Sequence, residues 1–238
     1  MKVSLCIPMY NEAEIIADTA KTLKKYMDEN FGSDYEIIFS NDGSVDGCDK
    51  IVTDLKLDNV RVVGYDENKG KGCAIRTAFL ASMGEYVMFT DSDLAYGTGV
   101  IKKMISALES SPDTDLAIGS RNIDSNGYEE YTFIRKLASK TYIKIVNLVG
   151  GFKLSDSQCG CKAFRGDAAK SIFSRCTVDG FAFDLEAILI SQKLGYKIKE
   201  VPVKVINHRE SKVNVLRDTF GMLSDLRKMK KRINKEFK

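Results

Sequence analysis

Short apolar runs alternate with longer amphipathic stretches through the first half of the chain, and this alternation constrains the fold most. Such spacing is typical of strands joined by crossover helices, which form a mostly parallel sheet with helices on both faces. We expect strands at Val3–Ile7, Tyr35–Ser40, Val60–Tyr65, Tyr86–Thr90 and Leu116–Gly119. Helical periodicity lies between them, at residues 12–29, 46–56, 70–82 and 97–110. The pattern predicts a mixed α/β fold.

The chain has 238 residues, of which 44% are hydrophobic, so it can bury the core of one large domain. Its charged residues nearly cancel to a net charge of +3, which argues against nucleic acid as a partner. The charges are unevenly placed, because Arg209 to Lys238 carry a surplus of six positive charges and leave −3 for the rest. The C-terminal segment is therefore basic and the body slightly acidic.

Two segments of the second half combine an apolar stripe with a basic one. Residues 133–149 align Lys136, Lys140 and Lys144 on one side of a helix, and Val215–Phe237 repeats the pattern. A basic amphipathic helix can lie on an anionic membrane surface, but it can also pack on a core with its lysines in water. No run of eighteen apolar residues occurs, so we expect no membrane-spanning helix.

Six cysteines are scattered along the chain, and several lie inside apolar stretches. This usage suits reduced thiols in a cytosolic protein. Cys159-Gly-Cys161 has the spacing of a possible zinc half-site, but no second pair follows and the chain has one histidine. We therefore expect no zinc site.

Asp91-Ser92-Asp93 directly follows the fourth predicted strand. The carboxyl ends of parallel strands build the binding crevice of an α/β sheet. Hard divalent cations such as Mg²⁺ or Mn²⁺ take carboxylate oxygens and share their coordination with substrate phosphates. The two aspartates thus predict a site for a metal and a diphosphate, although such a pair also occurs in solvated turns and helix caps.

Polar clusters follow three other strands in the same way. They are Pro8-Met9-Tyr10-Asn11-Glu12, Asn41-Asp42-Gly43-Ser44 and Asn68-Lys69-Gly70-Lys71-Gly72. The third places glycines and a lysine at a helix N-terminus, where backbone N–H groups can bind phosphate. Each cluster has a plainer interpretation: Asn11 as a helix N-cap and Asp42 as the start of a turn. The fingerprints of P-loop and dinucleotide-binding proteins are both missing.

Together these motifs resemble glycosyltransferase family 2, whose members invert the anomeric centre and have the GT-A fold. Gly119-Ser120-Arg121, Arg135 with Ser139, and Asp156-Ser-Gln-Cys-Gly160 resemble its polyprenyl-phosphate sugar synthases. The last block, with Phe183-Asp184-Leu185-Glu186, is more similar to dolichyl-phosphate glucosyltransferases than to the mannose branch. The resemblance implies one GT-A domain over 1–238, with a nucleotide-sugar half at 1–120 and an acceptor and membrane-facing half at 121–238.

The resemblance also implies roles for individual positions. Mg²⁺ or Mn²⁺ would be held by Asp91 and Asp93, and the catalytic residues would be Asp93, Arg121 and Arg135. The nucleotide would be bound by Pro8, Tyr10, Glu12, Asp42, Lys71 and Asp91. The acceptor phosphate would be bound by Arg121, Arg135 and Ser139. Asn41 and Ala95 depart from the family pattern, where an aspartate and, in mannose synthases, a polar side chain are usual.

A phosphate acceptor would need no general base, since a phosphomonoester with a second pKa near 6 is mostly dianionic at neutral pH. Our leading hypothesis is glucose transfer from UDP-glucose to a polyprenyl phosphate, by a peripheral protein at the cytoplasmic face of a membrane. A separate membrane protein could serve as its anchor. The alternatives are a GDP-mannose donor, or a polysaccharide hydroxyl acceptor with Asp156 or Asp184 as base. Two further alternatives are a nucleotide-sugar-binding adaptor without catalytic turnover and a nucleotidyltransferase.

Overall fold

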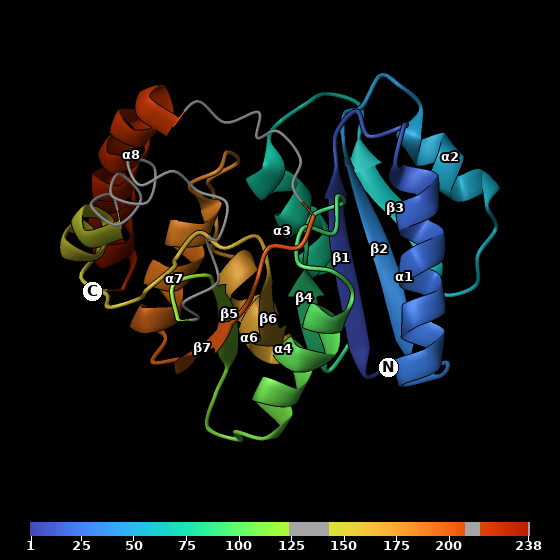
Figure 1. Cartoon of the computed structure of the whole chain (residues 1–238). Coiled ribbons are helices and arrows are strands. Elements are labelled where there is room, and N and C mark those ends of the chain that lie inside the picture. Colours follow the sequence, from blue (N-terminus) through green and yellow to red (C-terminus); the bar gives the residue numbers. More distant parts are fainter. Residues whose placement is uncertain (124–142, 208–214, 238) are drawn as a thin grey trace.

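The computed structural model describes residues 1–123, 143–207 and 215–237, with the backbone alone for 215–224. Within these residues the strands form one seven-stranded sheet in the order β3-β2-β1-β4-β6-β5-β7 (Figure 1). The strands are β1 (Val3–Met9), β2 (Tyr35–Asp42), β3 (Val60–Tyr65), β4 (Tyr86–Phe89), β5 (Leu116–Ser120), β6 (Lys162–Arg165) and β7 (Ile198–Pro202). All neighbouring strands are parallel except where β6 pairs with β4 and β5.

Helices connect these strands and cover the sheet (Figure 1). They are α1 (Ile16–Phe31), α2 (Cys48–Asp54), α3 (Lys71–Ala81), α4 (Gly99–Glu109), α6 (Gly166–Phe173), α7 (Phe183–Lys193) and α8 (Val215–Glu236). Residues 143–150 are also helical. The mixed α/β architecture expected from the alternation is therefore confirmed.

Each face of the sheet carries its own hydrophobic core, because successive strand residues point to opposite faces. In β1, Val3, Leu5 and Ile7 belong to the core shared with α1, α2 and α4, whereas Cys6 belongs to the other core. That second core is completed by α3, α6, α7 and α8. Burial on both faces explains why the central strands are nearly continuous apolar runs.

The chain reverses its course across the sheet between β1 and β4. From β1 it proceeds outward through β2 to β3, and α3 then carries it back to β4, on the other side of β1. In parallel sheets the crevice at such a reversal, outside the carboxyl ends of the strands, is where ligands bind. This topology brings the ends of β1, β2 and β4 to one edge.

The predicted elements of the first half are present, with ends displaced by up to four residues. The second half was predicted poorly: β6, β7, α6 and α7 had no expected counterpart. Strand β6 has only four residues, and it inserts between β4 and β5 after an excursion of more than forty residues. Such long-range pairing leaves no periodic signal in the sequence.

In the part of α8 whose side chains are described, residues 225–236, the apolar side packs on the protein. Leu226, Met229 and Ile233 are buried in the core that contains α7, while Arg227 and Lys231 are exposed. Of the two interpretations of the amphipathic pattern, core packing thus accounts for the apolar stripe of α8. No helix in the described part of the chain is long and apolar enough to cross a bilayer.

Candidate functional site

Two carboxylates and one ammonium meet at the carboxyl end of β4. Asp91 pairs with Lys71, the first residue of α3, and Asp93 accepts a hydrogen bond from the backbone N–H of Ala95 at 3.0 Å. Burial and the charge of Asp91 raise the pKa of Asp93 above its ordinary value. Burial disfavours the charge of Lys71, but the nearby carboxylates, Asp91 foremost, outweigh it and raise the pKa of Lys71.

The two carboxylates fit a divalent cation. Asp91 raises the pKa of Asp93 by its charge, so the two acids are close enough to repel each other, and Lys71 compensates only part of that charge. A hard cation takes such oxygens and fills its remaining positions with water and phosphate. The described residues contain no group of three His, Cys, Asp or Glu side chains arranged for a metal, so protein ligands alone would not saturate it there.

We expect Asp93→Asn to stabilise the metal-free protein at neutral pH. A carboxyl group whose pKa is raised in the folded state costs stability once it is ionised, and this cost appears as the pH rises through and above the unfolded pKa, about 4. Thermal unfolding with chelator should therefore give a higher midpoint for the variant at pH 7, and the difference should shrink toward pH 4. A variant less stable than the parent at pH 7 would contradict the assignment.

Asp42, at the end of β2, orders the loop that leads into α3. Its buried carboxylate accepts hydrogen bonds from the Tyr65 hydroxyl at 2.7 Å and from the backbone N–H groups of Lys69 and Gly70 at 2.9 Å. The Asn68 side chain adds a further donor at 3.0 Å. Asp42 therefore fixes the approach of Lys71 to the β4 edge, and its predicted contact with the nucleoside stays a prediction.

The loops after β1 and β2 are tied to each other. Asn11 adopts the left-handed conformation with φ 52°, and its Oδ1 accepts a hydrogen bond from the Val45 N–H at 3.0 Å. The Ser44 hydroxyl accepts one from the Asn11 N–H at 3.0 Å. The N-cap interpretation of Asn11 is wrong, because α1 begins five residues later, at Ile16, and its N-cap residue is Ile15. Asn11 instead joins two strand ends.

The other residues predicted at this edge differ in exposure. Pro8 is buried within β1, whereas Tyr10 follows the strand with 44% of its surface exposed. Glu12 is half-buried at the entrance to α1. An exposed ring at the sheet edge suits stacking on a base, so among these three the geometry favours Tyr10 for direct contact with a nucleoside.

The N-terminus of α3 does not offer its backbone to a phosphate, and this part of the sequence-based expectation is wrong. The N–H groups of Gly72 and Cys73 donate to the carbonyl oxygen of Asp179 at 2.7 and 3.2 Å. A Cβ on Gly70 or Gly72 would collide with the same segment, which explains both glycines. Of the predicted phosphate-binding motif, the side chain of Lys71 remains at the edge.

Arg121 follows β5 and makes a two-pronged ion pair with Asp156. Its Nε lies 2.6 Å from Oδ2 and its terminal nitrogen 2.9 Å from Oδ1, and Asp156 is 1% exposed. Burial disfavours the charge of Arg121, but the Asp156 carboxylate outweighs it and raises the pKa of Arg121 well above its usual value. A guanidinium held in this way is fixed in position and stays charged.

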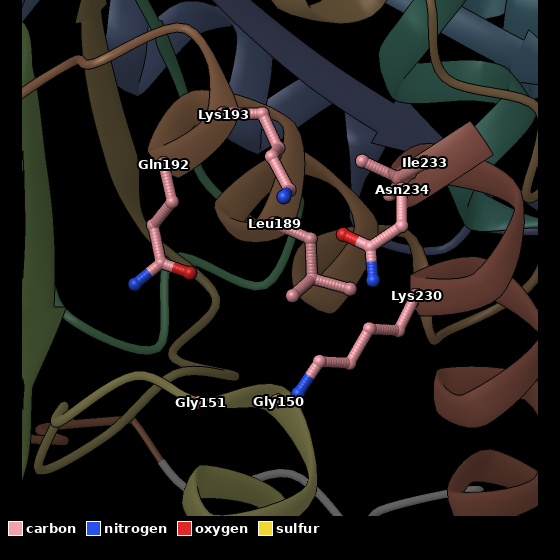
Figure 2. A pocket seen from close by; sticks show the side chains of 8 residues that line it. All are labelled: Gly150, Gly151, Leu189, Gln192, Lys193, Lys230, Ile233 and Asn234. Atoms are coloured by element: carbon pink, nitrogen blue, oxygen red, sulfur yellow. The ribbon is translucent and has the colours of Figure 1, made fainter. Parts of the chain in front are cut away.

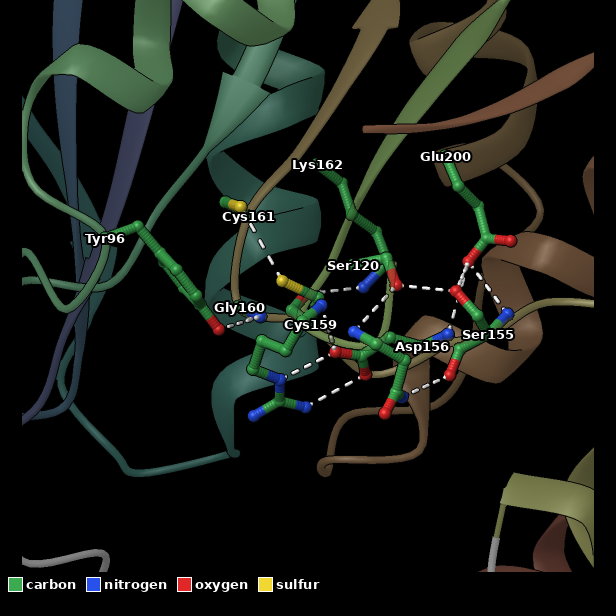
Figure 3. A network of polar contacts seen from close by, with 11 residues as sticks. Tyr96, Ser120, Ser155, Asp156, Cys159, Gly160, Cys161, Lys162 and Glu200 are labelled. Carbon is green, nitrogen blue, oxygen red and sulfur yellow. Dashed lines mark hydrogen bonds and ion pairs between the residues drawn. The ribbon is translucent and has the colours of Figure 1, made fainter. Parts of the chain in front are cut away.

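Residues 155–160 form a loop, here called the bridging loop, that is anchored at both ends (Figure 3). Glu200 of β7 accepts hydrogen bonds from the Ser155 hydroxyl at 2.6 Å and backbone N–H at 2.8 Å. At the other end the buried Lys162 donates to the Cys159 carbonyl at 2.8 Å and to Asp184 at 2.6 Å. Burial raises the pKa of Asp184, against the influence of Lys162.

The bridging loop also lies against the carboxylate of Asp91, which follows β4. A Cβ on Gly160 would meet the Oδ2 atom of Asp91, and the Gly160 N–H donates to the Tyr96 hydroxyl at 3.3 Å. The same short loop thus holds Arg121 through Asp156 and touches Asp91 through Gly160. Gly160 stands in the Asp156–Gly160 motif quoted above without a predicted role of its own, and Lys162, two residues beyond that motif, was not predicted at all.

We expect Gly160→Ala to weaken metal-dependent activity because the added methyl group must displace the Asp91 carboxylate. The metal concentration at half-maximal activity should rise by roughly tenfold, about 1.4 kcal/mol of binding free energy. Gly180→Ala is the matched control, since a Cβ there meets nothing within 4 Å. Equal metal titrations for both variants would show that Gly160 does not shape this site.

Arg135 and Ser139, predicted to bind an acceptor phosphate, lie outside the described residues, and so does most of the predicted helix at 133–149. The predicted lysine stripe is described only at Lys144, which is exposed. The two thiols of Cys159 and Cys161 are buried and lie 3.7 Å apart. The described residues contain no group of three or more His, Cys, Asp or Glu side chains that could hold a metal ion with these thiols.

Comparison with known proteins decides the family. The model of glycosyl transferase family 2 matches residues 4–173, which include the strand ends and the bridging loop. The chain is a family 2 glycosyltransferase. This glycosyltransferase is 30% identical to the dolichyl-phosphate beta-glucosyltransferase of Saccharomyces cerevisiae, over 94% of this chain and 72% of the yeast protein. It is 28% identical to glycosyltransferase AglD of Haloferax volcanii, over 95% of this chain and 36% of that protein.

Solved structures confirm the GT-A fold. The family 2 chain matches mannosyl-3-phosphoglycerate synthase from Rubrobacter xylanophilus with a TM-score of 0.71, at 18% identity over 99% of this chain and 75% of that one. It also matches glucosyl-3-phosphoglycerate synthase from Mycobacterium tuberculosis with a TM-score of 0.67, at 19% identity over 96% and 78% of the two chains. The latter structure contains Mn²⁺, uridine diphosphate and glucosyl-3-phosphoglycerate.

Proposed function

We propose that this glycosyltransferase moves glucose from UDP-glucose to a polyprenyl phosphate and inverts the anomeric centre. The observation that carries the proposal is the bridging loop, which holds an arginine on one side and touches the β4 carboxylate Asp91 on the other. A donor diphosphate and an acceptor phosphate would then meet across a single loop. The likeness to dolichyl-phosphate beta-glucosyltransferases supports glucose and a lipid acceptor.

On the donor side, Asp91 and Asp93 would hold Mg²⁺ or Mn²⁺, which neutralises charge on the leaving diphosphate when bound. The ammonium of Lys71 would turn from Asp91 toward a diphosphate oxygen, since its raised pKa keeps it charged. Tyr10 would stack on the base, and Glu12 and Asp42, with Pro8 beneath them in β1, would shape the nucleoside site.

On the acceptor side, Arg121 would bind the phosphate through paired hydrogen bonds and hold its oxygen in line with the anomeric carbon. Arg135 and Ser139 would complete the phosphate site. The dianionic phosphate supplies the nucleophile, so no side chain has to remove a proton. The bond from phosphate oxygen to C1 forms as the bond from C1 to the UDP oxygen breaks, and UDP leaves with the electron pair.

The pairing of the acids disfavours a hydroxyl acceptor. A hydroxyl needs a carboxylate base, and Asp156 and Asp184 were the candidates. Asp156 is bound in two places by Arg121, and Asp184 by the buried Lys162 at 2.6 Å. Both carboxylates are buried and already accept hydrogen bonds from these cations, so neither is positioned to take a proton from a hydroxyl acceptor. We therefore favour a phosphate acceptor over a polysaccharide hydroxyl.

A lipid acceptor would bring this chain to a membrane surface. We place it as a peripheral protein at the cytoplasmic face, with residues 1–120 serving the nucleotide sugar and 121–238 the acceptor and membrane. A separate membrane-anchoring protein is compatible with this arrangement.

An activity panel tests the proposal. Purified protein with Mg²⁺ or Mn²⁺ is incubated with UDP-glucose, GDP-mannose or other nucleotide sugars, each crossed with polyprenyl phosphates and a polysaccharide. We expect lipid-linked glucose only from UDP-glucose with a polyprenyl phosphate, detected by mass spectrometry. Product from GDP-mannose or on the polysaccharide would replace this assignment, and tight nucleotide binding without any product would favour an adaptor.

A further inference from the structure

Two adjoining hollows flank α8. The first, ≈ 310 Å³, lies between α7, α8 and the glycine pair that ends helix 143–150 (Figure 2). Its lining consists of Gly150, Gly151, Leu189, Gln192, Lys193, Lys230, Ile233 and Asn234. In Figure 2 the polar ends of these side chains surround an aliphatic floor that includes Leu189. The lining contains donors, amide oxygens and apolar groups, but no carboxylate.

The second hollow, ≈ 550 Å³, shares Lys230 and Asn234 with the first. It is completed by Val149, Arg227, Lys231 and Lys235. Four of its six lining residues are cations and none is an acid, so the hollow concentrates positive charge. Residues 227, 231 and 235 are spaced by four and form one stripe along α8.

The cations of α8 divide into two sets. Arg232 pairs with Glu186 at 2.5 Å and with Glu236 at 3.2 Å, and Lys228 lies 3.5 Å from Asp225. Lys230 donates to the carbonyl oxygen of Val149 at 2.9 Å, which ties α8 to helix 143–150. The structure gives Arg227, Lys231 and Lys235 no acidic partner among the described residues. These three are the charges that can serve an external anion.

Aliphatic side chains stand exposed on the helix beside this basic stripe. Leu148 is 83% exposed and Ile145 is 39% exposed, and Val149, which lines the second hollow, follows directly. Cations next to exposed aliphatic groups suit the boundary between phosphate headgroups and acyl chains in a bilayer. Double-stranded nucleic acid would offer the anion but no apolar phase for Leu148.

We propose that the two hollows around Lys230 dock the phosphate headgroup of an anionic membrane phospholipid, while Leu148 and Ile145 enter the adjoining bilayer interface. The inference rests on the proposed function, which brings the chain to a membrane, and it names the surface lipid as a partner separate from the acceptor. The headgroup phosphate lies among Arg227, Lys231 and Lys235, beside Lys230, whose ammonium already donates to the Val149 carbonyl. The contribution of α8 to binding is electrostatic, because its apolar residues Leu226, Met229 and Ile233 are already buried in the core.

Vesicle co-sedimentation without any nucleotide sugar or polyprenyl phosphate tests the proposal. The unmodified chain should bind vesicles in which a third of the lipid is phosphatidylglycerol, and should not bind phosphatidylcholine vesicles. Arg227→Gln with Lys231→Gln should lower the partition constant by roughly thirtyfold, at about 1 kcal/mol for each basic residue near an anionic surface. Both side chains are exposed, so folding is expected to survive.

The matched control removes two exposed lysines from α1, Lys21→Gln with Lys25→Gln, at the other side of the molecule (Figure 1). An equal loss of binding in this control would show that net charge alone acts, and would overturn the site. Binding of a DNA duplex with the same affinity as the anionic vesicles would also overturn it. Transfer to a detergent-dispersed polyprenyl phosphate should be unchanged in the α8 variant, so failure to bind vesicles leaves the proposed activity intact.

Discussion

Asp91→Asn is expected to slow sugar transfer by roughly 10³-fold while the chain remains folded. The change removes one of two carboxylates that would hold the metal, and with it the stabilisation of the leaving diphosphate, an effect of several kcal/mol in comparable sites. Asp91 and its partner Lys71 are both only half-buried, so the loss of their pair should cost little stability. Steady-state kinetics over a range of Mn²⁺ concentrations would measure the effect.

The control is Asp58→Asn, the same change at an exposed residue before β3. It should leave the rate within twofold of the unmodified chain. An Asp91→Asn variant with the control's rate would show that the β4 edge is not where the diphosphate departs. Loss of activity accompanied by an unfolded circular-dichroism spectrum would instead assign Asp91 to the fold.

Arg121→Met is expected to abolish transfer and to destabilise the fold by about 3–5 kcal/mol. The substitution leaves Asp156, 1% exposed, as a buried charge without its guanidinium partner. Removing both charges in Arg121→Met with Asp156→Asn should restore most of that stability, because no isolated ion remains. Denaturant unfolding of the four chains in this cycle gives the coupling between the two residues.

The double variant separates the two roles of Arg121. If the guanidinium binds the acceptor phosphate, the stable double variant stays inactive. If Arg121 serves only to neutralise Asp156, the double variant recovers activity together with stability. Recovery of transfer would therefore contradict the proposed acceptor site. Asp156→Asn alone should keep part of the activity, since its Oδ1 can still accept from Arg121.

The sequence was sufficient to predict that the residues at the ends of β2 and β4 meet at one edge of the sheet. Asp42 and Asp91 follow strands that are buried on both faces, and parallel pairing then brings their ends together without further information. Helix α3, which begins at Lys71, was also predicted, because glycines mark its start. Local pattern and global topology agree in this half of the chain.

The rest of the site depends on contacts between distant segments. The carbonyl of Asp179 accepts hydrogen bonds from the amides of Gly72 and Cys73 from more than a hundred residues away, so the backbone phosphate site predicted from the local motif was wrong. Lys162 would be expected at the surface as a charged residue, yet its buried ammonium is satisfied by Asp184 and Cys159. Such pairings follow from the tertiary fold and leave no local signal.

Diffraction from crystals grown with Mn²⁺ and UDP-glucose tests the central claim most directly, because anomalous scattering locates manganese without reference to the refined side chains. We predict one strong peak at about 2.2 Å from a carboxylate oxygen of Asp91 or Asp93, the usual range for a hard cation. The diphosphate should lie on the same ion, beside Lys71. A manganese peak remote from the end of β4, with the diphosphate bound elsewhere, would contradict the account.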